Sequence, residues 1–347
     1  MIRKLKNLRW RPPADWDKVS TIDMHAGGEP LRILVHGIPE VKGRTILEKR
    51  KFFKDHLDHI RKGIIWEPRG HSDMYGAVIT ESCTDDGDFG VFFLHNDGYS
   101  TMCGHAIIAL TKFVLDTRMV RTKASTYTLQ IDAPPGRIVS TGFRKGGVVS
   151  SVSFRNVPSF VLHRDQHVEV PGLGRIKYDV AFGGAFYAIV EADKLSLSLD
   201  VREYDRLIDL GRRIKKSVNT NQKITHPFEN ELSFLYGVIF TGKPFNPSRH
   251  SRNVCVFANG EVDRSATGTG VSARAALHYA RGDLKMGDRI VIESIVGSDM
   301  EVELAGLTTY GPHKAIIPVV SGTASFTGKH QFWFDPDDPF RDGFFMR

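Results

Sequence analysis

Two short motifs, far apart in the sequence, carry side chains suited to acid–base chemistry. The first is MCGH at residues 102–105, which places a thiol at Cys103, and the second is DRSATGTG at residues 263–270, which places a hydroxyl at Thr267. Each motif precedes a run with the apolar spacing of a helix. A helix N-terminus presents free backbone N–H groups and the positive end of the helix dipole, so each motif could hold an anion.

Cys103 is the candidate general base. A thiol at a helix N-terminus is the kind whose pKa is lowered, and a thiolate near neutral pH can accept a proton. The alternative interpretation is a buried structural cysteine that happens to open a helix. The presence of the second motif favours the catalytic interpretation.

Further segments of the chain, together with the two motifs, carry a resemblance to a known family. They are, in order, DMHAGGEP at 23–30, EPRGH at 67–71, FGGAFY at 182–187, NVC at 253–255, IVGS at 295–298, IP at 317–318 and GTA at 322–324. With these segments the chain resembles, almost end to end, the proline racemase family, which includes proline racemases, hydroxyproline 2-epimerases and trans-3-hydroxy-L-proline dehydratases. So many ordered matches leave little room for chance, although each alone is weak.

The resemblance gives the two motifs their roles. In the racemases and epimerases of the family, one cysteine removes the α-proton from one face and a second cysteine delivers a proton to the other. Here the second position is Thr267. An alcohol is too weak an acid to alternate between neutral and anionic forms at physiological pH. The resemblance associates this Cys/Thr pairing with the dehydratase branch.

The stereochemistry of trans-3-hydroxy-L-proline gives an independent reason for this interpretation. Its C3 hydroxyl lies on the same ring face as the α-hydrogen, so one group on that face could serve both. Cys103 would take the α-proton as a thiolate, and the resulting thiol could protonate the departing hydroxyl. The immediate enamine would tautomerise to Δ1-pyrroline-2-carboxylate.

The neighbours of the two motif residues are the candidate carboxylate-binding groups. Backbone N–H groups of Gly104 and His105 on one side, and of Gly268 and Thr269 on the other, could hold the substrate carboxylate and stabilise enediolate-like charge. Glycine permits close approach at both places. His105 could also orient Cys103 or the leaving hydroxyl, and the alternative is a histidine that is hydrogen-bonded in the core.

Two further residues are candidates for the substrate-binding site. In the family an acid four residues before the second catalytic position binds the ring nitrogen, and here that residue is Asp263. Its carboxylate would pair with the substrate ammonium and keep the amine protonated, unless it is only a carboxylate in the turn before a helix. His226, just before Pro227 in a loop-like stretch, is a weaker candidate for lining the pocket.

The elements that must position these residues alternate between many short strands and a few helices. Helices are predicted over 42–62, after Cys103, over 201–216 and after Thr267. Strands are predicted in the β-branched runs at 31–35, 76–80, 91–94, 148–154, 236–240 and 289–292. Because both motif-bearing helices follow several strands, the chain indicates a loose internal duplication without a repeat at the residue level.

The family resemblance implies an α/β (α+β) fold like that of diaminopimelate epimerase. It has two similar lobes, each a curved, mostly antiparallel sheet or barrel around a central helix, with the site in the cleft between them. We expect residues 1–183 to form the first lobe and 184–297 the second, with 298–347 returning to the first. Such a cleft closes over a small ligand by hinge motion in many two-lobed proteins.

Composition agrees with a globular enzyme. The chain has 347 residues, 41% hydrophobic and 25% charged, which is ordinary for a soluble protein with two cores. The net charge of +7 and the basic residues within 3–11 allow a nucleic-acid-binding alternative, but the other basic residues are dispersed among 40 acids and no nucleic-acid motif is present. The N-terminus lacks the apolar segment of a signal peptide, and no run is long enough for a membrane span.

The cysteines and histidines give no sign of a disulfide framework or a metal site. Three widely spaced cysteines favour a reducing compartment, and we expect a cytoplasmic protein with Cys83 and Cys255 buried and inert. His56 and His59 have the spacing of a metal pair, but a solvated helix face is the better interpretation without further ligands. We expect no metal, no organic cofactor and an amino-acid substrate, and a homodimer is compatible with the sequence.

Two other functions stay open at this point. One is a hydroxyproline 2-epimerase or proline racemase with an unusual second base. The other is an amino-acid-binding relative that has lost turnover, against which the retention of Cys103, His105 and Asp263 speaks.

Overall fold

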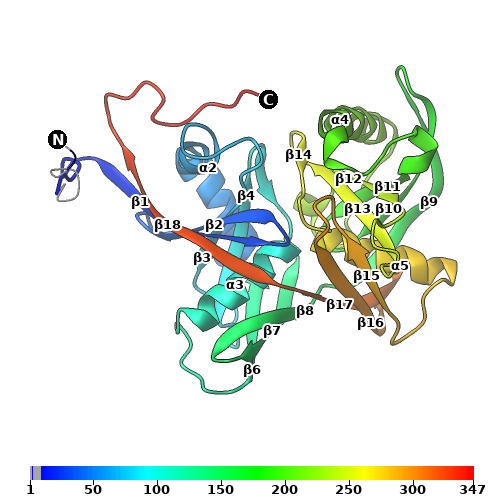
Figure 1. The fold of residues 1–347 in the computed structure, drawn as a ribbon, viewed down its shortest axis with the longest axis horizontal. Helices are drawn as coiled ribbons and strands as arrows, with labels where there is room; N and C mark the ends of the chain where they lie inside the picture. Colours follow the sequence, from blue (N-terminus) through cyan, green and yellow to red (C-terminus); the bar gives the residue numbers. More distant parts are fainter. Residues whose placement is uncertain (1, 3–8) are drawn as a thin grey trace.

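The structure, a computed structural model, describes residues 2 and 9–347. The basic residues Arg3, Lys4 and Lys6, on which the nucleic-acid alternative partly depended, lie outside the described residues. The described helices are α2 (Ile46–Ile65), α3 (Gly104–Asp116), α4 (Tyr204–Asn221) and α5 (Gly268–Arg281), with 3-10 turns η1 (Ala192–Leu195), η2 (Val201–Glu203) and η3 (Asn230–Leu232) (Figure 1).

The helices predicted from the sequence are confirmed, with small shifts at their ends. The helix predicted over 42–62 begins only at Ile46, because the Thr45 side chain accepts a hydrogen bond from the backbone N–H of Glu48 and caps the first turn. The helix predicted over 201–216 begins with the turn η2 and continues as α4 to Asn221. The other two follow directly after Cys103 and Thr267.

One half of the molecule contains the N-terminal strands, α2 and α3. Its strands are β1 (Asp17–Ala26), β2 (Glu29–His36), β3 (Gly76–Thr80), β4 (Phe89–His95), β5 (Gly98–Ser100), β6 (Thr126–Ala133), β7 (Gly136–Lys145), β8 (Val148–Arg155) and β18 (Ala324–Phe334). They pair in the order β18-β1-β2-β3-β4-β6-β7-β8, and β5 pairs with β4. We call this half the first lobe.

The other half contains α4 and α5. Its strands are β9 (Ser159–Val170), β10 (Gly174–Phe182), β11 (Phe186–Glu191), β12 (Leu235–Gly242), β13 (Ser251–Phe257), β14 (Glu261–Val262), β15 (Arg289–Glu293), β16 (Asp299–Tyr310) and β17 (His313–Gly322). The pairing order β9-β10-β11-β12-β13-β15-β16-β17 closes on itself, because β17 also pairs with β9. We call this half the second lobe.

The two lobes repeat one topology. In each, an antiparallel pair is followed by a parallel pair whose crossover contains a helix: β2 to β3 through α2, and β11 to β12 through α4. In each, a second parallel pair encloses the motif-bearing helix: β4 to β6 around α3, and β13 to β15 around α5. The predicted internal duplication is therefore confirmed at the level of topology.

The motif-bearing helices are the centres of the two lobes. Helix α3 contacts β1, β2, β7, β8 and β18, whereas α5 contacts β9, β10, β16 and β17. Nearly all of their side chains are buried. A helix that is covered by strands around its circumference needs small and apolar residues on every face, as both sequences have.

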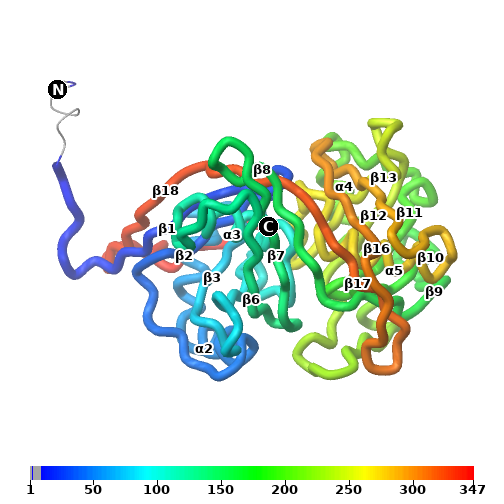
Figure 2. The backbone as a smooth tube through the Cα atoms, turned by 90° about the horizontal axis from the view of Figure 1, so that it is seen from below, coloured from blue at the N-terminus to red at the C-terminus, as the bar shows by residue number. Residues whose placement is uncertain are grey.

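The strand pairing supports lobe boundaries that differ from the predicted 183/184 and 297/298. β9 and β10 pair with β11 and β17, in the second lobe. The chain returns along β17, whose last residues pair with β8, and β18 then pairs with β1. Figures 1 and 2 show β9, β10, β16 and β17 on the side of α5. We propose a first lobe of residues 17–155 and 319–347 and a second lobe of 159–318, since 319–322 pair with β8.

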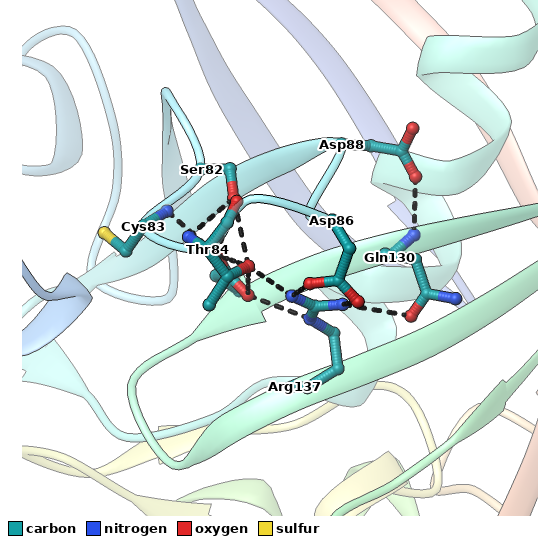
Figure 3. Close-up of polar contacts among 8 residues, drawn as sticks. Ser82, Cys83, Thr84, Asp86, Asp88, Gln130 and Arg137 are labelled. Atoms are coloured by element: carbon teal, nitrogen blue, oxygen red, sulfur yellow. Dashed lines mark hydrogen bonds and ion pairs between the residues drawn. The ribbon is translucent and has the colours of Figure 1, made fainter.

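A polar network fixes a surface loop of the first lobe (Figure 3). The Asp132 carboxylate accepts hydrogen bonds from the Ser82 hydroxyl, the backbone N–H of Cys83, the Thr84 hydroxyl and the Arg137 guanidinium.

The prediction of a buried Cys83 was wrong, since this loop residue is only half-buried, whereas Cys255 in β13 is buried. Within the described part of the chain, no helix is long and apolar enough to cross a membrane.

Candidate active site

The N-termini of α3 and α5 meet in the centre of the molecule. A Cβ atom added to Gly104 would lie 2.6 Å from the Cα atom of Gly268, and one added to Gly268 would lie 2.7 Å from the Cα atom of Gly104. Real side chains do not tolerate such distances, so the two backbones approach each other only because both residues are glycine. The positive ends of two helix dipoles therefore lie side by side, as predicted for a carboxylate site.

Cys103 is the N-cap residue of α3. Its backbone is extended, and its sulfur accepts a hydrogen bond from the backbone N–H of Ala106 at 3.4 Å. The Nδ1 atom of His105 lies 3.0 Å from the sulfur. The sequence prediction that His105 contacts the thiol is consistent with this geometry.

The electrostatic environment of Cys103 differs from the sequence expectation. Burial raises the pKa of the thiol well above its usual value, and the hydrogen bond from Ala106 opposes that shift only in part. The negative charge of Asp263 adds to the increase. The helix terminus was expected to lower this pKa, but the closed site removes the water that would also solvate a thiolate.

His105 is buried beside the thiol. Burial lowers the pKa of its imidazole to about 3, opposed by a hydrogen bond to the carbonyl of Pro30. The ring also packs edge-on against Tyr75, with centroids 4.9 Å apart. The imidazole is therefore neutral at physiological pH and can exchange a hydrogen bond with the sulfur without forming an ion pair.

Thr267 occupies the equivalent N-cap position of α5. Its φ of 66° lies in the left-handed region, which is unusual for a β-branched residue and marks local strain. Its hydroxyl is buried and makes no hydrogen bond to any described residue. Buried hydroxyls normally have a partner, so this oxygen is open to a group that enters the site.

Asp263 is a buried carboxyl between the end of β14 and the start of α5. Its Oδ1 accepts the backbone N–H of Ser265 at 2.8 Å. Burial raises the pKa of this carboxyl to about 6, against the effect of Ser265. A cation placed against Asp263 would remove this penalty and ionise the carboxyl.

A small cavity with buried lining residues lies between the two helix termini. It is lined by Tyr75, Met102, Cys103, Gly104, His105, Tyr187, Tyr236, Phe257, Asp263, Thr267, Gly268 and Thr269. Its volume is about 10 Å³, room for about one water molecule. The structure thus brings together all but one of the predicted site residues.

The aromatic wall of this cavity was not identified from the sequence. Tyr187 lies in the FGGAFY segment that carried the resemblance, and its hydroxyl is 2.6 Å from the hydroxyl of Thr269. Tyr75, Tyr236 and Phe257 come from three separate strand regions, and no local pattern marks them.

His226 is the predicted residue that the structure does not bring into the cavity. Its Nδ1 accepts the backbone N–H groups of Phe228 and Glu229, and its Nε2 lies 3.3 Å from the hydroxyl of Tyr310. This histidine fixes its own loop instead of lining the site. Among the residues that the structure describes, no group of three or more His, Cys, Asp or Glu side chains could hold a metal ion.

Comparison with known proteins shows to which family the chain belongs. The family model described as "Proline racemase" matches residues 21–345, nearly the whole chain. The chain belongs to the proline racemase family.

Two curated relatives carry the same name. A protein of Colwellia psychrerythraea named trans-3-hydroxy-L-proline dehydratase is 45% identical over 346 residues, which cover 99% of this chain and 98% of the relative. A human protein of the same name is 44% identical over 335 residues, 95% of each chain.

A solved structure in the same family shares the fold. It is a hydroxyproline epimerase from Agrobacterium vitis with bound trans-4-hydroxy-L-proline, with a TM-score of 0.91, 28% identity and 96% of each chain covered. The expected fold of the proline racemase family is therefore confirmed.

Proposed function

We propose that this protein is a hydro-lyase that converts trans-3-hydroxy-L-proline to Δ1-pyrroline-2-carboxylate and water. The observation that carries the proposal is the pairing of a thiol, Cys103, with a hydroxyl, Thr267, at the N-caps of two abutting helices. Relatives named for this dehydration, 41–45% identical over nearly their full length, support it.

The site offers a complementary group for each charge of the substrate. The carboxylate fits between the N-termini of α3 and α5, where backbone N–H groups of Gly104, His105, Gly268 and Thr269 can donate to it and to the enediolate-like charge of the transition state. The ring ammonium pairs with Asp263, whose pKa is raised by burial and would be lowered by a cation beside it.

One residue then serves both halves of the reaction. The Cys103 thiolate removes the α-proton, and the electron pair of that C–H bond expels the C3 hydroxyl. The proton that the sulfur took is returned to the leaving oxygen on the same ring face, which releases water. The product is an enamine, and its tautomerisation to Δ1-pyrroline-2-carboxylate conserves all remaining atoms.

The high pKa of buried Cys103 determines when the base forms. In the closed site, burial and Asp263 both oppose ionisation. We infer that the thiol ionises while the site is open to water, where the helix N-terminus stabilises the anion, and that closure follows with the substrate ammonium against Asp263.

Incubation with trans-3-hydroxy-L-proline, trans-4-hydroxy-L-proline and L-proline tests the proposal directly. Pyrroline carboxylate should form from the 3-hydroxy compound, also in the presence of a chelator, while the optical rotation of the other two stays constant. Robust racemisation of L-proline, or epimerisation of the 4-hydroxy compound with solvent deuterium uptake, would instead establish a two-base enzyme.

A further inference from the structure

Two buried glutamates outside the cavity contact the opposite lobe in the same way. Glu29, at the start of β2 in the first lobe, accepts the backbone N–H of Arg264 at 2.7 Å. Glu261, at the start of β14 in the second lobe, accepts the backbone N–H of Asn96 at 2.6 Å. Each lobe therefore supplies one carboxyl to the backbone of the other.

The second oxygen of each carboxyl has no partner among the described residues. Oε1 of Glu29 and Oε2 of Glu261 are both buried, and neither residue is exposed to solvent. A buried carboxylate oxygen without a partner is costly, whereas a protonated carboxyl avoids the charge. Burial accordingly raises the pKa of both carboxyls well above their usual value.

Glu29 also lies close in the structure to two residues of the site, His105 and Asp263. The residue after it, Pro30, lies beside His105 in the first lobe, where its carbonyl raises the pKa of the imidazole. The residue whose N–H it accepts, Arg264, directly follows Asp263 in the second lobe. The dipeptide 29–30 thus lies between His105 of the first lobe and the residue that follows Asp263 in the second.

We propose that Glu29 and Glu261 are reciprocal positioning residues that lock the two lobes around the substrate, with Glu29 setting Asp263 for its contact with the ammonium. The substrate in this statement rests on the function proposed above. The locking contacts themselves do not depend on it, because they join residues of the two lobes directly.

The two contacts between the lobes should favour closure less as the pH rises. Opening would hydrate both carboxyls and let them ionise, so their pKa is higher in the closed form than in the open form. Closure is then fully favoured at pH values below the open-form pKa and weakens as the pH rises towards the closed-form pKa. Glu29 and Glu261 influence each other. The other titratable or charged groups that interact with them include Asp73, Cys103, Lys215, Cys255, Asp263, Arg264 and Arg347.

Amide hydrogen exchange at Arg264 and Asn96 tests the lock without any substrate. Glu29→Ala should speed exchange at Arg264, and Glu261→Ala should speed exchange at Asn96, because each loses its acceptor. Glu→Gln at either position should keep the protection, since the amide copies the neutral carboxyl and retains the accepting oxygen. The matched control is Glu48→Ala, which removes an exposed carboxyl that accepts the Arg44 N–H within one lobe.

Steady-state kinetics test the positioning role. Glu29→Ala should raise KM for trans-3-hydroxy-L-proline about tenfold, with a smaller change in kcat. A tenfold change corresponds to the net contribution of roughly one hydrogen bond. Glu29→Gln should restore KM. Between pH 5 and 8 the rise of KM with pH that the two glutamates cause should be absent from the Glu29→Gln/Glu261→Gln double variant. Ionisation of Asp263 acts in the opposite direction in both proteins, because it strengthens the contact with the ammonium as the pH rises.

Two results would overturn the lock. One is unchanged exchange at both amides in the alanine variants, and the other is a Gln variant that behaves like the Ala variant at the same site. If the wild type does not dehydrate the substrate, the proposed function fails, while the exchange experiment still decides on the lock.

Discussion

Two residues in equivalent positions of the lobes differ in their capacity for acid–base chemistry. Cys103 and Thr267 are the N-cap residues of α3 and α5, but only the thiol can ionise within the physiological range. Thr267 adds a buried hydroxyl without a partner among the described residues and a strained backbone. A symmetrical fold therefore holds an asymmetrical pair, as expected for a reaction that uses a single ring face.

Replacement of Cys103 by serine should lower kcat by about 10²- to 10⁴-fold, because an alcohol cannot supply the base near neutral pH. The fold should persist, since serine fills nearly the same volume and can still cap α3. Turnover and denaturant unfolding of the purified variant measure the two effects. Near-normal turnover would remove the thiolate from the mechanism.

Replacement of Thr267 by cysteine should add epimerase activity on trans-4-hydroxy-L-proline or racemase activity on proline. A second thiol could hand a proton to the far face of the carbanion that Cys103 forms. Dehydration of the 3-hydroxy substrate should fall or become mixed with inversion, which chiral analysis of the product mixture detects.

The control for this experiment is Thr267→Ala, which removes the hydroxyl and adds no acid. It should retain part of the dehydratase activity, because Cys103 is left in place. Complete inactivity of a folded Thr267→Ala protein would mean that the hydroxyl takes part in the chemistry, and the one-base scheme would have to be abandoned.

The elements act on the site through the contact between α3 and α5. Gly268→Ala should push the helices apart, since its methyl group would lie 2.7 Å from the Cα atom of Gly104. Overpacking of this kind costs about 1–3 kcal/mol of unfolding free energy, and the loss of activity should be larger because the carboxylate site is split. Gly104→Ala should behave alike, and full activity of both variants would show that the close contact is dispensable.

The helices and the two motifs were predictable because their signals are local. A capping residue, a glycine and an apolar period lie within a few residues of Cys103 and of Thr267. Tyr75, Tyr236 and Glu29 were not identified as site residues because their place depends on long-range pairing of strands. His226 does not line the cavity, and a histidine in a loop gives no sign in the sequence that neighbouring backbone N–H groups donate to it.

The lobe boundary was hard to place from the sequence for a similar reason. The predicted boundary falls between Gly183 and Gly184, where the chain packs closely against the second lobe: a Cβ atom on Gly183 would lie 2.1 Å from the carbonyl oxygen of Thr269 in α5. The strand pairing supports a crossing near Asn156 instead. Asn156 forms hydrogen bonds to Gly183 and Ser272, so the crossing is specified by contacts that are distant in sequence.

At the scale of the whole molecule, one charged cluster joins the lobes beside the glutamates. Asp73 of the first lobe binds Arg264 at 2.8 Å and also contacts Tyr204 and Arg347. These partners hold the pKa of Asp73 at about 2 although the residue is buried. The carboxylate is therefore ionised throughout the physiological range.

Asp73→Asn should lower the free energy of unfolding by about 2 kcal/mol at pH 7, which corresponds to lowering the pKa of an aspartate from its ordinary value to about 2. A lowered pKa contributes stability above the unfolded-state value and loses it as the pH falls towards 2. The difference between wild type and variant in denaturant unfolding should hence shrink below about pH 4. A difference that stays constant down to pH 2 would contradict the ionised cluster.

The cavity of about 10 Å³ has a consequence for the speed of the enzyme. A cavity that holds about one water molecule is too small for an amino acid, so we expect the lobes to separate in each catalytic cycle. The turnover rate would then depend on the viscosity of the solvent. Turnover should slow as sucrose thickens the buffer, more steeply than for an enzyme with an open site, and the product escapes no faster than the molecule can open.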